Sequence, residues 1–473
     1  MDVTALLTHP SADSIVAYRG GRALRVQQFL DDARHLAESL PRGRHLLNAC
    51  ADRYRFAVGL AASLMTGRVS LLPSTHTPEV IRHLLQFAPD TFCLTDDDAC
   101  AIELPRVRYS DAVTTLDSAS FASEVRPSAT FRVPQIPDDQ LAAIVFTSGS
   151  TGTPLPYRKT WGRLAACVRA EAGELKITDG RRFTLIGTVP PQHMYGFEST
   201  VLVALQSSNA FTAERPFYPA DIALAVAAAP RPRALITTPV HLRTLMAACR
   251  PWPALDLVVS ATAPLSTELA REAESRSGAP LLEIYGSTET GQIAIRRTGE
   301  SEAFRLFPGV RLRADNGQTY AHGGHIEQMT PMCDVIELAG EREFILHGRT
   351  ADLVNVAGKR SSFGYLNAQL NAIPGVQDGA FFLRERDQGG ATGIARLAAA
   401  AVAPGLSTAS LLDSLRQRID PVFLPRPLLL VNRLPRNSTG KLPHQALEAL
   451  IDQHLQTHTT ESGASKRSPH GNS

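Results

Sequence analysis

Residues 141–161 read LAAIVFTSGSTGTPLPYRKTW, an apolar run followed by a segment rich in Gly, Ser and Thr. The apolar residues 141–145 follow two aspartates, a pattern that predicts a short buried strand closed by Phe146. Residues 147–154 then offer small side chains, hydroxyls and backbone N–H groups, which a phosphate oxygen can approach closely. These features predict a phosphate-binding loop, and a flexible Ser/Gly linker is the alternative interpretation.

Two other phosphate-binding patterns do not fit this chain. The P-loop of NTPases requires GxxxxGK[ST], whereas Gly149 and Gly152 stand closer together and no Lys follows them. Residues 357–361 (AGKRS) also fail this pattern, because position 353 is Leu353 rather than Gly. Kinase motifs are missing as well, so a phosphotransferase is disfavoured.

Length and composition set the general class of the protein. The chain has 473 residues, of which 44% are hydrophobic and 20% charged, so it can bury a large core and should form two or three lobes. A net charge of +2 gives no indication of a nucleic-acid groove or an anionic membrane partner. The six cysteines show no CxxC or Cys/His spacing, which predicts reduced thiols without disulfides or zinc. Because no signal-peptide pattern or membrane-length apolar run is present, we expect a cytoplasmic protein.

Strand-like and helix-like segments alternate through the first two thirds of the chain. Strands are predicted at 45–50, 69–72, 91–94, 182–189, 234–237, 255–260 and 281–284, and helices at 53–66, 78–87 and 161–175. A further helix at 266–276 has Ser266 as its N-cap candidate and Gly278 just past its end. This alternation predicts an α/β fold built on parallel sheets, with the Ser/Pro-rich residues 118–137 as a surface connection.

Loops of unusual composition follow the central strands. They contain His193, Tyr195, Gly196 and Phe197 after one strand, and the ATAP and YGSTE segments after two others. In an open parallel sheet, ligands bind outside the carboxyl ends of the strands, so these loops, the phosphate loop and the loop at Thr238-Pro239 are expected to lie at one sheet edge and converge on one crevice. A structural histidine is the alternative for His193, and a core position is the alternative for Tyr195 and Phe197.

After residue 327 the predicted secondary structure changes to short, alternating segments typical of β-strands. Short strands at 334–338 and 342–347 predict a hairpin, followed by a turn at 348–352 and then by a small α+β lobe. The predicted domains are 1–348, 349–456 and a disordered polar tail at 457–473. A loop near the end of the small lobe presents Lys441 after a glycine.

The ordered set of motifs resembles the adenylate-forming superfamily of acyl-CoA synthetases, aryl-acid ligases and peptide-synthetase adenylation domains. The motifs are TSGSTGTP at 147–154, ATAPL at 261–265, YGSTE at 285–289, Gly348-Arg349 with Asp352, and PRNSTGK at 435–441. The resemblance covers most of the chain. It implies a large N-terminal lobe of parallel-rich sheets with flanking helices, plus a small mobile C-terminal α+β lobe. It also implies ATP and Mg²⁺ as cofactors, with CoA or a phosphopantetheinylated carrier protein as acyl acceptor.

The resemblance further implies roles for individual residues. The implied catalytic residues are Lys441, Glu289, His193 and Thr147, and Thr288 and Glu289 would hold Mg²⁺. The nucleotide would contact Thr147, Ser148, Gly149, Ser150, Thr151, Gly152, Ala261, Thr262, Ala263, Tyr285, Gly286, Ser287, Thr288, Asp334 and Arg349. The acid would lie against Tyr195, Gly196, Phe197 and Ser260, and Asp352 would be the hinge of the small lobe. For an isolated Glu or a polar turn residue, a solvated surface position is the alternative.

The chain departs from the family pattern at two places. The loop lysine that usually follows the proline is replaced by Leu155, with basic residues only at Arg158 and Lys159, and Asn355 stands where a lysine often follows the hinge. The run YRKTWG at 157–162 resembles the subgroup that accompanies aryl polyene and xanthomonadin-type pigment synthesis. That subgroup implies an aryl acid such as a hydroxybenzoate. A fatty acyl-CoA synthetase is one alternative, and a non-catalytic adenylate-binding regulatory or scaffold protein is another.

Overall fold

The structure is a computed structural model that divides the chain into two compact units. It describes residues 2–73, 75–109, 131–148, 154–248, 251–315, 318–349, 353–356, 359–383, 397–437, 442–443, 446–447 and 449–450. Unit 1 comprises Met1–Met332 and Leu338–Phe344, and unit 2 comprises Cys333–Glu337 and Ile345–Ser473. The domain boundary expected after residue 348 stays a prediction, and that position falls within a strand of unit 2.

A six-stranded sheet of unit 1 carries the strand that precedes the predicted phosphate loop. Its order is β10-β9-β5-β4-β6-β7. The strands are β4 (His45–Asn48), β5 (Val69–Leu72), β6 (Phe92–Thr95), β7 (Arg106–Arg108), β9 (Leu141–Ser148) and β10 (Pro154–Thr160). All neighbours pair in parallel except β9 and β10, which form an antiparallel hairpin. Helices α2 (Arg53–Met65) and α3 (Pro78–Phe87) connect its parallel strands.

An eleven-stranded sheet carries the other predicted loops, and its unit 1 part runs β17-β16-β15-β14-β13-β11-β12-β2-β3. These strands are β2 (Ile15–Arg19), β3 (Arg22–Arg25), β11 (Thr184–Gly187), β12 (Ala210–Thr212), β13 (Arg233–Thr237), β14 (Leu257–Ser260), β15 (Leu281–Ser287), β16 (Gly291–Arg296) and β17 (Ala303–Leu306). The neighbours from β2 to β15 pair in parallel, so their carboxyl ends share one edge.

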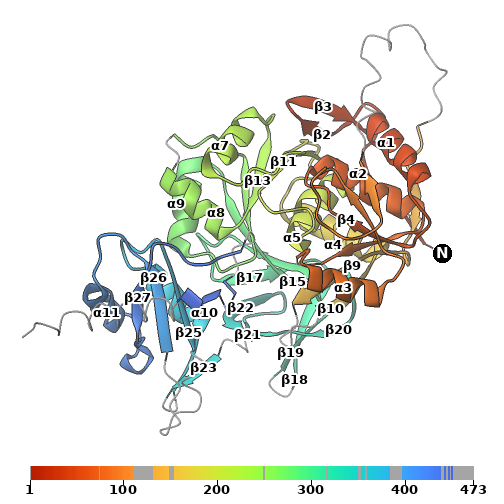
Figure 1. Cartoon of the computed structure of the whole chain (residues 1–473). Helices are drawn as coiled ribbons and strands as arrows, with labels where there is room; N and C mark the ends of the chain where they lie inside the picture. Colours follow the sequence, from red (N-terminus) through yellow and green to blue (C-terminus); the bar gives the residue numbers. More distant parts are fainter. Residues whose placement is uncertain are drawn as a thin grey trace, which may run out of the picture. The chain divides into compact units, whose positions relative to one another are not determined.

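Helices cover this sheet through buried apolar contacts. Helices α7 (Pro219–Ala228), α8 (Pro239–Ala248) and α9 (Thr267–Ser277) lie together along one face (Figure 1). Side chains such as Leu242 and Ala270 pack there against strand residues such as Val258, and all three are fully buried. The remaining helices of unit 1 are α1 (Val26–Ser39), α4 (Trp161–Glu174), α5 (Met194–Gly196), the π-helical segment η2 (Phe197–Leu202) and α6 (Val203–Gln206).

Two smaller sheets complete unit 1. Strand β1 (Val3–Ala5) pairs with β8 (Gln135–Pro137), and β18 (Val310–Asp315), β19 (Gln318–Gly323) and β20 (Ile326–Pro331) form an antiparallel meander. The strands β21 (Asp334–Leu338) and β22 (Glu343–Arg349) are each divided between the units.

Unit 2 is a small α+β body with its own apolar core. Its elements are β23 (Leu353–Val356), β24 (Lys359–Ser362), α10 (Phe363–Asn371), β25 (Asp378–Leu383), β26 (Leu397–Val402), α11 (Thr408–Arg416), the 3₁₀ turn η5 (Pro421–Phe423) and β27 (Leu428–Leu430). Side chains from both helices, such as Leu366 and Leu411, pack with strand residues such as Phe381. The predicted α/β architecture with a small α+β lobe is confirmed.

Several local predictions are confirmed and three are wrong. Helix α3 matches its predicted bounds, and Ser266 caps α9 while Gly278 ends it with a φ of 70°. The expected loops do not all belong to one sheet, because β9 lies in the six-stranded sheet. Residues 285–287 belong to β15 rather than to a loop, because they pair with β16, and residues 348–349 continue β22 instead of forming a turn.

Candidate functional site

The predicted phosphate loop connects the two strands of the β9–β10 hairpin. Thr147 and Ser148 lie in the last part of β9, where they pair with Leu155 and Pro154 of β10. Gly149, Ser150, Thr151 and Gly152 lie outside the described residues, as do the side chains of Thr147 and Ser148. The sequence analysis missed β10, because its prolines and charged residues do not produce a strand pattern.

The segment after β11 places His193, Gly196 and Phe197 in different environments. His193 caps the short helix α5, and its Nδ1 atom accepts a hydrogen bond of 3.2 Å from the backbone N–H of Tyr195. A Cβ atom at Gly196 would lie 2.2 Å from the Pro190 carbonyl oxygen, so only glycine fits there. Phe197 is fully buried and packs edge-to-face against Phe56, with ring centroids 6.2 Å apart. Phe197 therefore takes the core position that was the alternative to a pocket wall.

Tyr195 connects this segment to β14. It is 3% exposed, and its hydroxyl donates a hydrogen bond of 3.1 Å to the Val259 carbonyl. The next residue, Ser260, is fully buried, and its Oγ atom has no hydrogen-bond partner in the described part of the chain. The predicted acid-pocket residues Tyr195 and Ser260 are thus both buried, and the hydrogen bond to Val259 joins Tyr195 to the residue that precedes Ser260.

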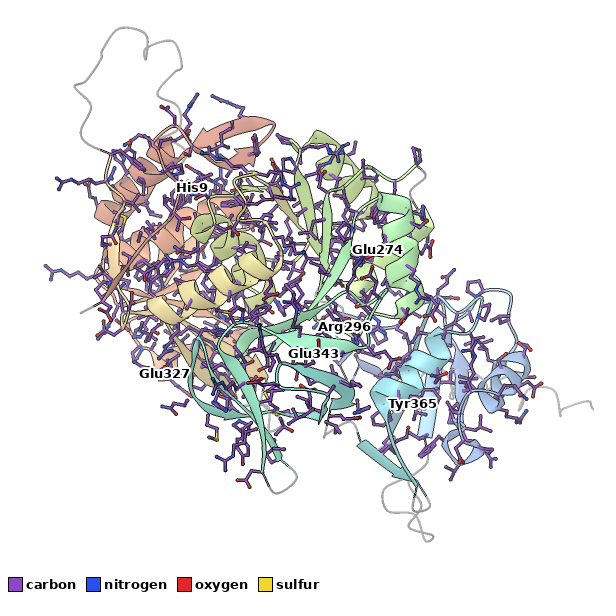
Figure 2. The ribbon with its side chains drawn as sticks, turned by 180° about the vertical axis from the view of Figure 1, so that it is seen from behind. His9, Glu274, Arg296, Glu327, Glu343 and Tyr365 are labelled. Carbon is purple, nitrogen blue, oxygen red and sulfur yellow. The ribbon has the colours of Figure 1, made fainter. Side chains whose placement is uncertain are left out.

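The ATAP segment after β14 is tied to the neighbouring strand β15. Thr262 has a φ of 81°, which is a strained conformation for a β-branched residue. The backbone N–H of Leu265 donates to Glu283 across 3.2 Å, and Arg296 of β16 holds the same carboxylate through a 2.7 Å ion pair. Arg296, labelled in Figure 2, also stacks over Phe304 at 4.3 Å. These contacts anchor the chain at Leu265, directly after Ala261 and Ala263, which were predicted to border the nucleotide.

Tyr285 of β15 is held by a cluster of aromatic rings. Its ring centroid lies 5.6 Å from that of Phe304 and 5.4 Å from that of Phe344, and the residue is 9% exposed. Gly286 follows as an exposed residue at the end of the strand. The aromatic cluster therefore sets the orientation of the tyrosine next to the exposed Gly286 near the end of β15.

The turn after β15 presents the predicted metal-binding residues. Thr288 and Glu289 are both half-buried, between Ser287 and Thr290. The Ser287 and Thr290 hydroxyls lie 3.1 Å apart, and the Thr290 N–H donates to the Ser287 Oγ atom across 3.2 Å. The Nζ atom of Lys159 donates to the Glu289 carbonyl across 3.2 Å, which joins the β9–β10 hairpin to this turn.

A hydroxyl and a carboxylate suit Mg²⁺ that arrives with phosphate ligands. Magnesium prefers hard oxygen ligands and often takes only one or two carboxylates from the protein, with phosphates and waters completing its shell. Within the described ranges, no group of three or more His, Cys, Asp or Glu side chains could hold a metal ion alone. Thr288 and Glu289 therefore fit magnesium bound together with a nucleotide.

Sequence reasoning missed two buried carboxyl groups near this turn. Glu171 of α4 is fully buried and Glu198 of η2 is 1% exposed. Burial raises the pKa of Glu171 to about 8, and it raises the pKa of Glu198 to about 7 although the charge of Lys159 opposes that shift. No apolar periodicity pointed to either residue. Glu198 lies in FESTVL (197–202), which folds as a π-helix, a conformation frequent at functional sites.

The other predicted site residues belong to unit 2 or are not described. Asp334 begins β21 and is half-buried, and Arg349 ends β22 with its side chain outside the described residues. Asp352 and Lys441 also fall outside the residues that the structure describes, as does the predicted disordered tail at 457–473.

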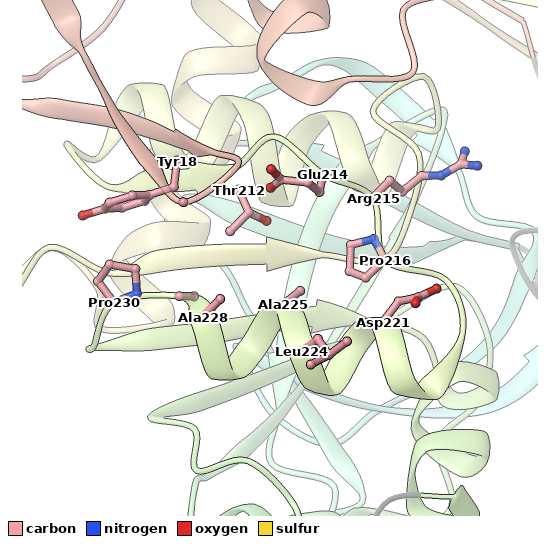
Figure 3. Close-up of a pocket in the computed structure, with 12 residues that line it drawn as sticks. Tyr18, Thr212, Glu214, Arg215, Pro216, Asp221, Leu224, Ala225, Ala228 and Pro230 are labelled. Carbon is pink, nitrogen blue, oxygen red and sulfur yellow. The ribbon is translucent and has the colours of Figure 1, made fainter.

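A surface pocket of about 490 Å³ lies elsewhere in unit 1, beside α7 (Figure 3). Its lining residues are Tyr18, Gly21, Thr212, Glu214, Arg215, Pro216, Asp221, Leu224, Ala225, Ala228, Ala229 and Pro230. No residue predicted for nucleotide, acid or metal binding is among them. The pocket is therefore distinct from the predicted site.

Solved structures with the same architecture define the class. ATP-bound MatB from Rhodopseudomonas palustris matches with a TM-score of 0.77 and 19% identity, over 94% of this chain and 97% of that protein. O-succinylbenzoate CoA synthetase (MenE) from Bacillus subtilis, in complex with ATP and magnesium, matches with a TM-score of 0.75 and 17% identity, again over 94% and 97%. The fold is that of the adenylate-forming ligases.

Sequence comparison gives the family directly. Residues 5–316 match the family of AMP-binding enzymes, and the chain belongs to that family. A 4-coumarate–CoA ligase of Rhodobacter capsulatus is 30% identical over 235 residues, which are 50% of this chain and 59% of that enzyme. A 4-coumarate–CoA ligase of Halorhodospira halophila is 29% identical over 307 residues, which are 63% of this chain and 73% of that enzyme. In the described part of the chain, no helix is long and apolar enough to cross a membrane.

Proposed function

We propose that this chain catalyses the ATP-dependent activation of a carboxylic acid and transfers the acyl group to a thiol. The observation that carries the proposal is the turn after β15, where Thr288 and Glu289 offer oxygen ligands at the carboxyl edge of the parallel strands. Membership of the AMP-binding enzymes and the naming of its relatives as CoA ligases support the same reaction.

The first half-reaction brings an anionic acid toward a polyanion. A carboxylate oxygen forms a bond to the α-phosphorus of ATP, and the bond from that phosphorus to the bridging oxygen breaks, which releases pyrophosphate. Bound Mg²⁺ would neutralise phosphate charge, with Glu289 and Thr288 as its protein ligands. The phosphate loop at 147–152 would donate backbone N–H groups, and Lys441 would supply positive charge between the two anions.

The second half-reaction transfers the acyl group from the adenylate. A thiolate attacks the acyl carbon, and the bond from that carbon to the phosphate oxygen breaks, which releases AMP. We propose CoA or a phosphopantetheinylated carrier protein as the source of the thiol. The resemblance of YRKTWG to the pigment-associated subgroup favours the carrier protein, and the curated relatives favour CoA.

For the acid, we propose a small planar aryl acid such as a hydroxybenzoate. Tyr195 and Ser260 would line its pocket, and two relatives carry the name 4-coumarate–CoA ligase. A pyrophosphate-release assay over aryl and fatty acids, with CoA or a carrier protein as acceptor, tests the choice of acid and the choice of thiol acceptor. We expect aryl acids to give the higher kcat/KM, and a preference for chains of twelve or more carbons would instead support a fatty acyl-CoA synthetase.

The proposed metal-binding role of Glu289 can be tested by comparing pyrophosphate release in a Glu289 variant and in a control carboxylate variant. Replacing Glu289→Gln should reduce pyrophosphate release by on the order of 10²-fold, because a ligand charge for magnesium is lost. The exposed Glu302→Gln variant should retain full activity. If wild-type protein binds ATP but releases no pyrophosphate with any acid, the chain is a non-catalytic adenylate-binding protein.

A further inference from the structure

Three side chains from separate elements hold the backbone of the turn after β15. The Lys159 Nζ atom donates to the Glu289 carbonyl at 3.2 Å, and the His325 Nε2 atom lies 3.1 Å from the Thr290 carbonyl. The Cys167 thiol donates to the Gln292 carbonyl at 3.6 Å. These side chains come from β10, from the β19–β20 connection and from α4. The backbone carbonyls of Glu289, the predicted magnesium ligand, and of two residues that follow it are thereby held by side chains.

The space behind the turn also contains a buried carboxyl group. The Oε1 atom of Glu198 accepts a hydrogen bond of 3.7 Å from the Cys167 thiol. At Gly291, which has a φ of 73°, an added Cβ atom would lie 3.2 Å from this oxygen and 3.2 Å from the sulfur. No larger residue fits at Gly291 without displacing this group, so the turn packs closely on Glu198.

Lys159 and Glu198 are coupled by charge. Lys159 is partly buried, and its pKa is lowered by burial, while the negative charge of Glu198 opposes that shift. The positive charge of Lys159 in turn opposes the rise that burial causes in the pKa of Glu198. Each group therefore reduces the cost of placing the other in a poorly solvated region.

We propose that Lys159 is a positioning residue for magnesium–ATP binding, which holds the Glu289 backbone while Glu198 supplies its counter-charge. This inference rests on the proposed role of Glu289. It also gives a function to one of the two basic residues, Arg158 and Lys159, that follow Leu155, the replacement for the usual loop lysine. The contact that assigns this role is the hydrogen bond from the Lys159 Nζ atom to the backbone carbonyl of Glu289.

The test compares ATP binding by calorimetry with magnesium and with EDTA, in wild type and in Lys159→Met. We expect the variant to lose about tenfold in affinity for ATP with magnesium, while its affinity for ATP in EDTA stays within twofold of wild type. In steady state, the KM for magnesium–ATP should rise and the KM for the acid should not. Arg158→Met, an exposed position one residue earlier on β10, is the matched control and should change neither affinity.

A second variant separates positioning from folding. Lys159→Met combined with Glu198→Gln removes both charges, so it should recover the stability of wild type but keep the weakened magnesium-dependent binding. Recovery of that binding in the double variant, or wild-type binding in Lys159→Met, would overturn the inference.

The variant Glu289→Gln distinguishes a failure of the proposed metal role of Glu289 from a failure of the positioning role of Lys159. If both Glu289→Gln and Lys159→Met bind magnesium–ATP as wild type does, the proposed metal role of Glu289 fails. If Glu289→Gln binds it more weakly and Lys159→Met does not, only the role of Lys159 is rejected.

Discussion

The Tyr195 hydroxyl and the Val259 carbonyl oxygen are joined by a 3.1 Å hydrogen bond, which ties the segment after β11 to the end of β14. The phenol is 3% exposed, and burial raises its pKa well above the usual range, so it stays protonated and donates at any physiological pH. One end of the ring is therefore fixed, and its remaining surface is presented in a defined orientation.

Replacing Tyr195→Phe tests whether this orientation matters for the acid. We expect a loss of about 1 kcal/mol in the free energy of unfolding, because the Val259 carbonyl loses a buried donor. The KM for an aryl acid should rise severalfold, while the KM for ATP should stay unchanged. Urea unfolding and steady-state kinetics measure the two effects, and a change in the KM for ATP alone would contradict the placement of Tyr195 beside the acid.

The phosphate loop can be tested without changing its size. Thr147→Val and Thr151→Val each replace a hydroxyl with a methyl group, so each should raise the KM for ATP by about tenfold if that hydroxyl contacts phosphate. The melting temperature should be unchanged. Thr330→Val on β20 provides a control for loss of a threonine hydroxyl elsewhere. Wild-type ATP kinetics in both loop variants would reject the assignment.

Lys441 should act in adenylation but not in thioester formation. Its charge can bridge the acid and the α-phosphate, so Lys441→Ala should reduce acid-dependent pyrophosphate exchange by on the order of 10²- to 10³-fold. Transfer from a supplied acyl-adenylate to the thiol should persist, because rotation of the small lobe about Asp352 would bring a different face of that lobe to the adenylate. Equal loss of both half-reactions in a folded variant would rule out this two-position mechanism.

Glu171 should make the protein less stable as the pH rises. Its folded-state pKa of about 8 exceeds the ordinary value of 4.5, so between these values the native state binds more protons than the unfolded state and the free energy of unfolding falls. Glu198, with a pKa of about 7, acts with the same sign up to that pH. The net effect of Glu171 is on the order of a few kcal/mol above pH 8.

The variant Glu171→Gln measures this effect. Its advantage over wild type in the urea concentration needed for unfolding should be larger at pH 8.5 than at pH 5.5, because the amide cannot acquire the buried charge. The exposed Glu272→Gln on α9 should show no pH-dependent difference of this kind. An identical stability change at both pH values would mean that Glu171 does not titrate in this window.

Features that depend on neighbouring residues could be predicted from the amino-acid sequence. Helix α3 and the caps of α9 were predicted because apolar periodicity, an N-cap hydroxyl and a C-terminal glycine act within a few residues. The order of the motifs was likewise sufficient for the adenylate-forming class, because their spacing along the chain is a linear property.

Contacts between residues far apart in the chain could not be predicted in this way. The β9–β10 hairpin and the YGSTE segment come from different sheets, and the Lys159–Glu289 hydrogen bond that connects them spans 130 residues. Strand β10 was missed because its hydrogen bonds are made with β9 and leave no periodic pattern in its own residues. The burial of Glu198 and Phe197 depends on what packs against η2. Local sequence carries no information about such packing partners, so the burial of these two residues is seen only in the folded chain.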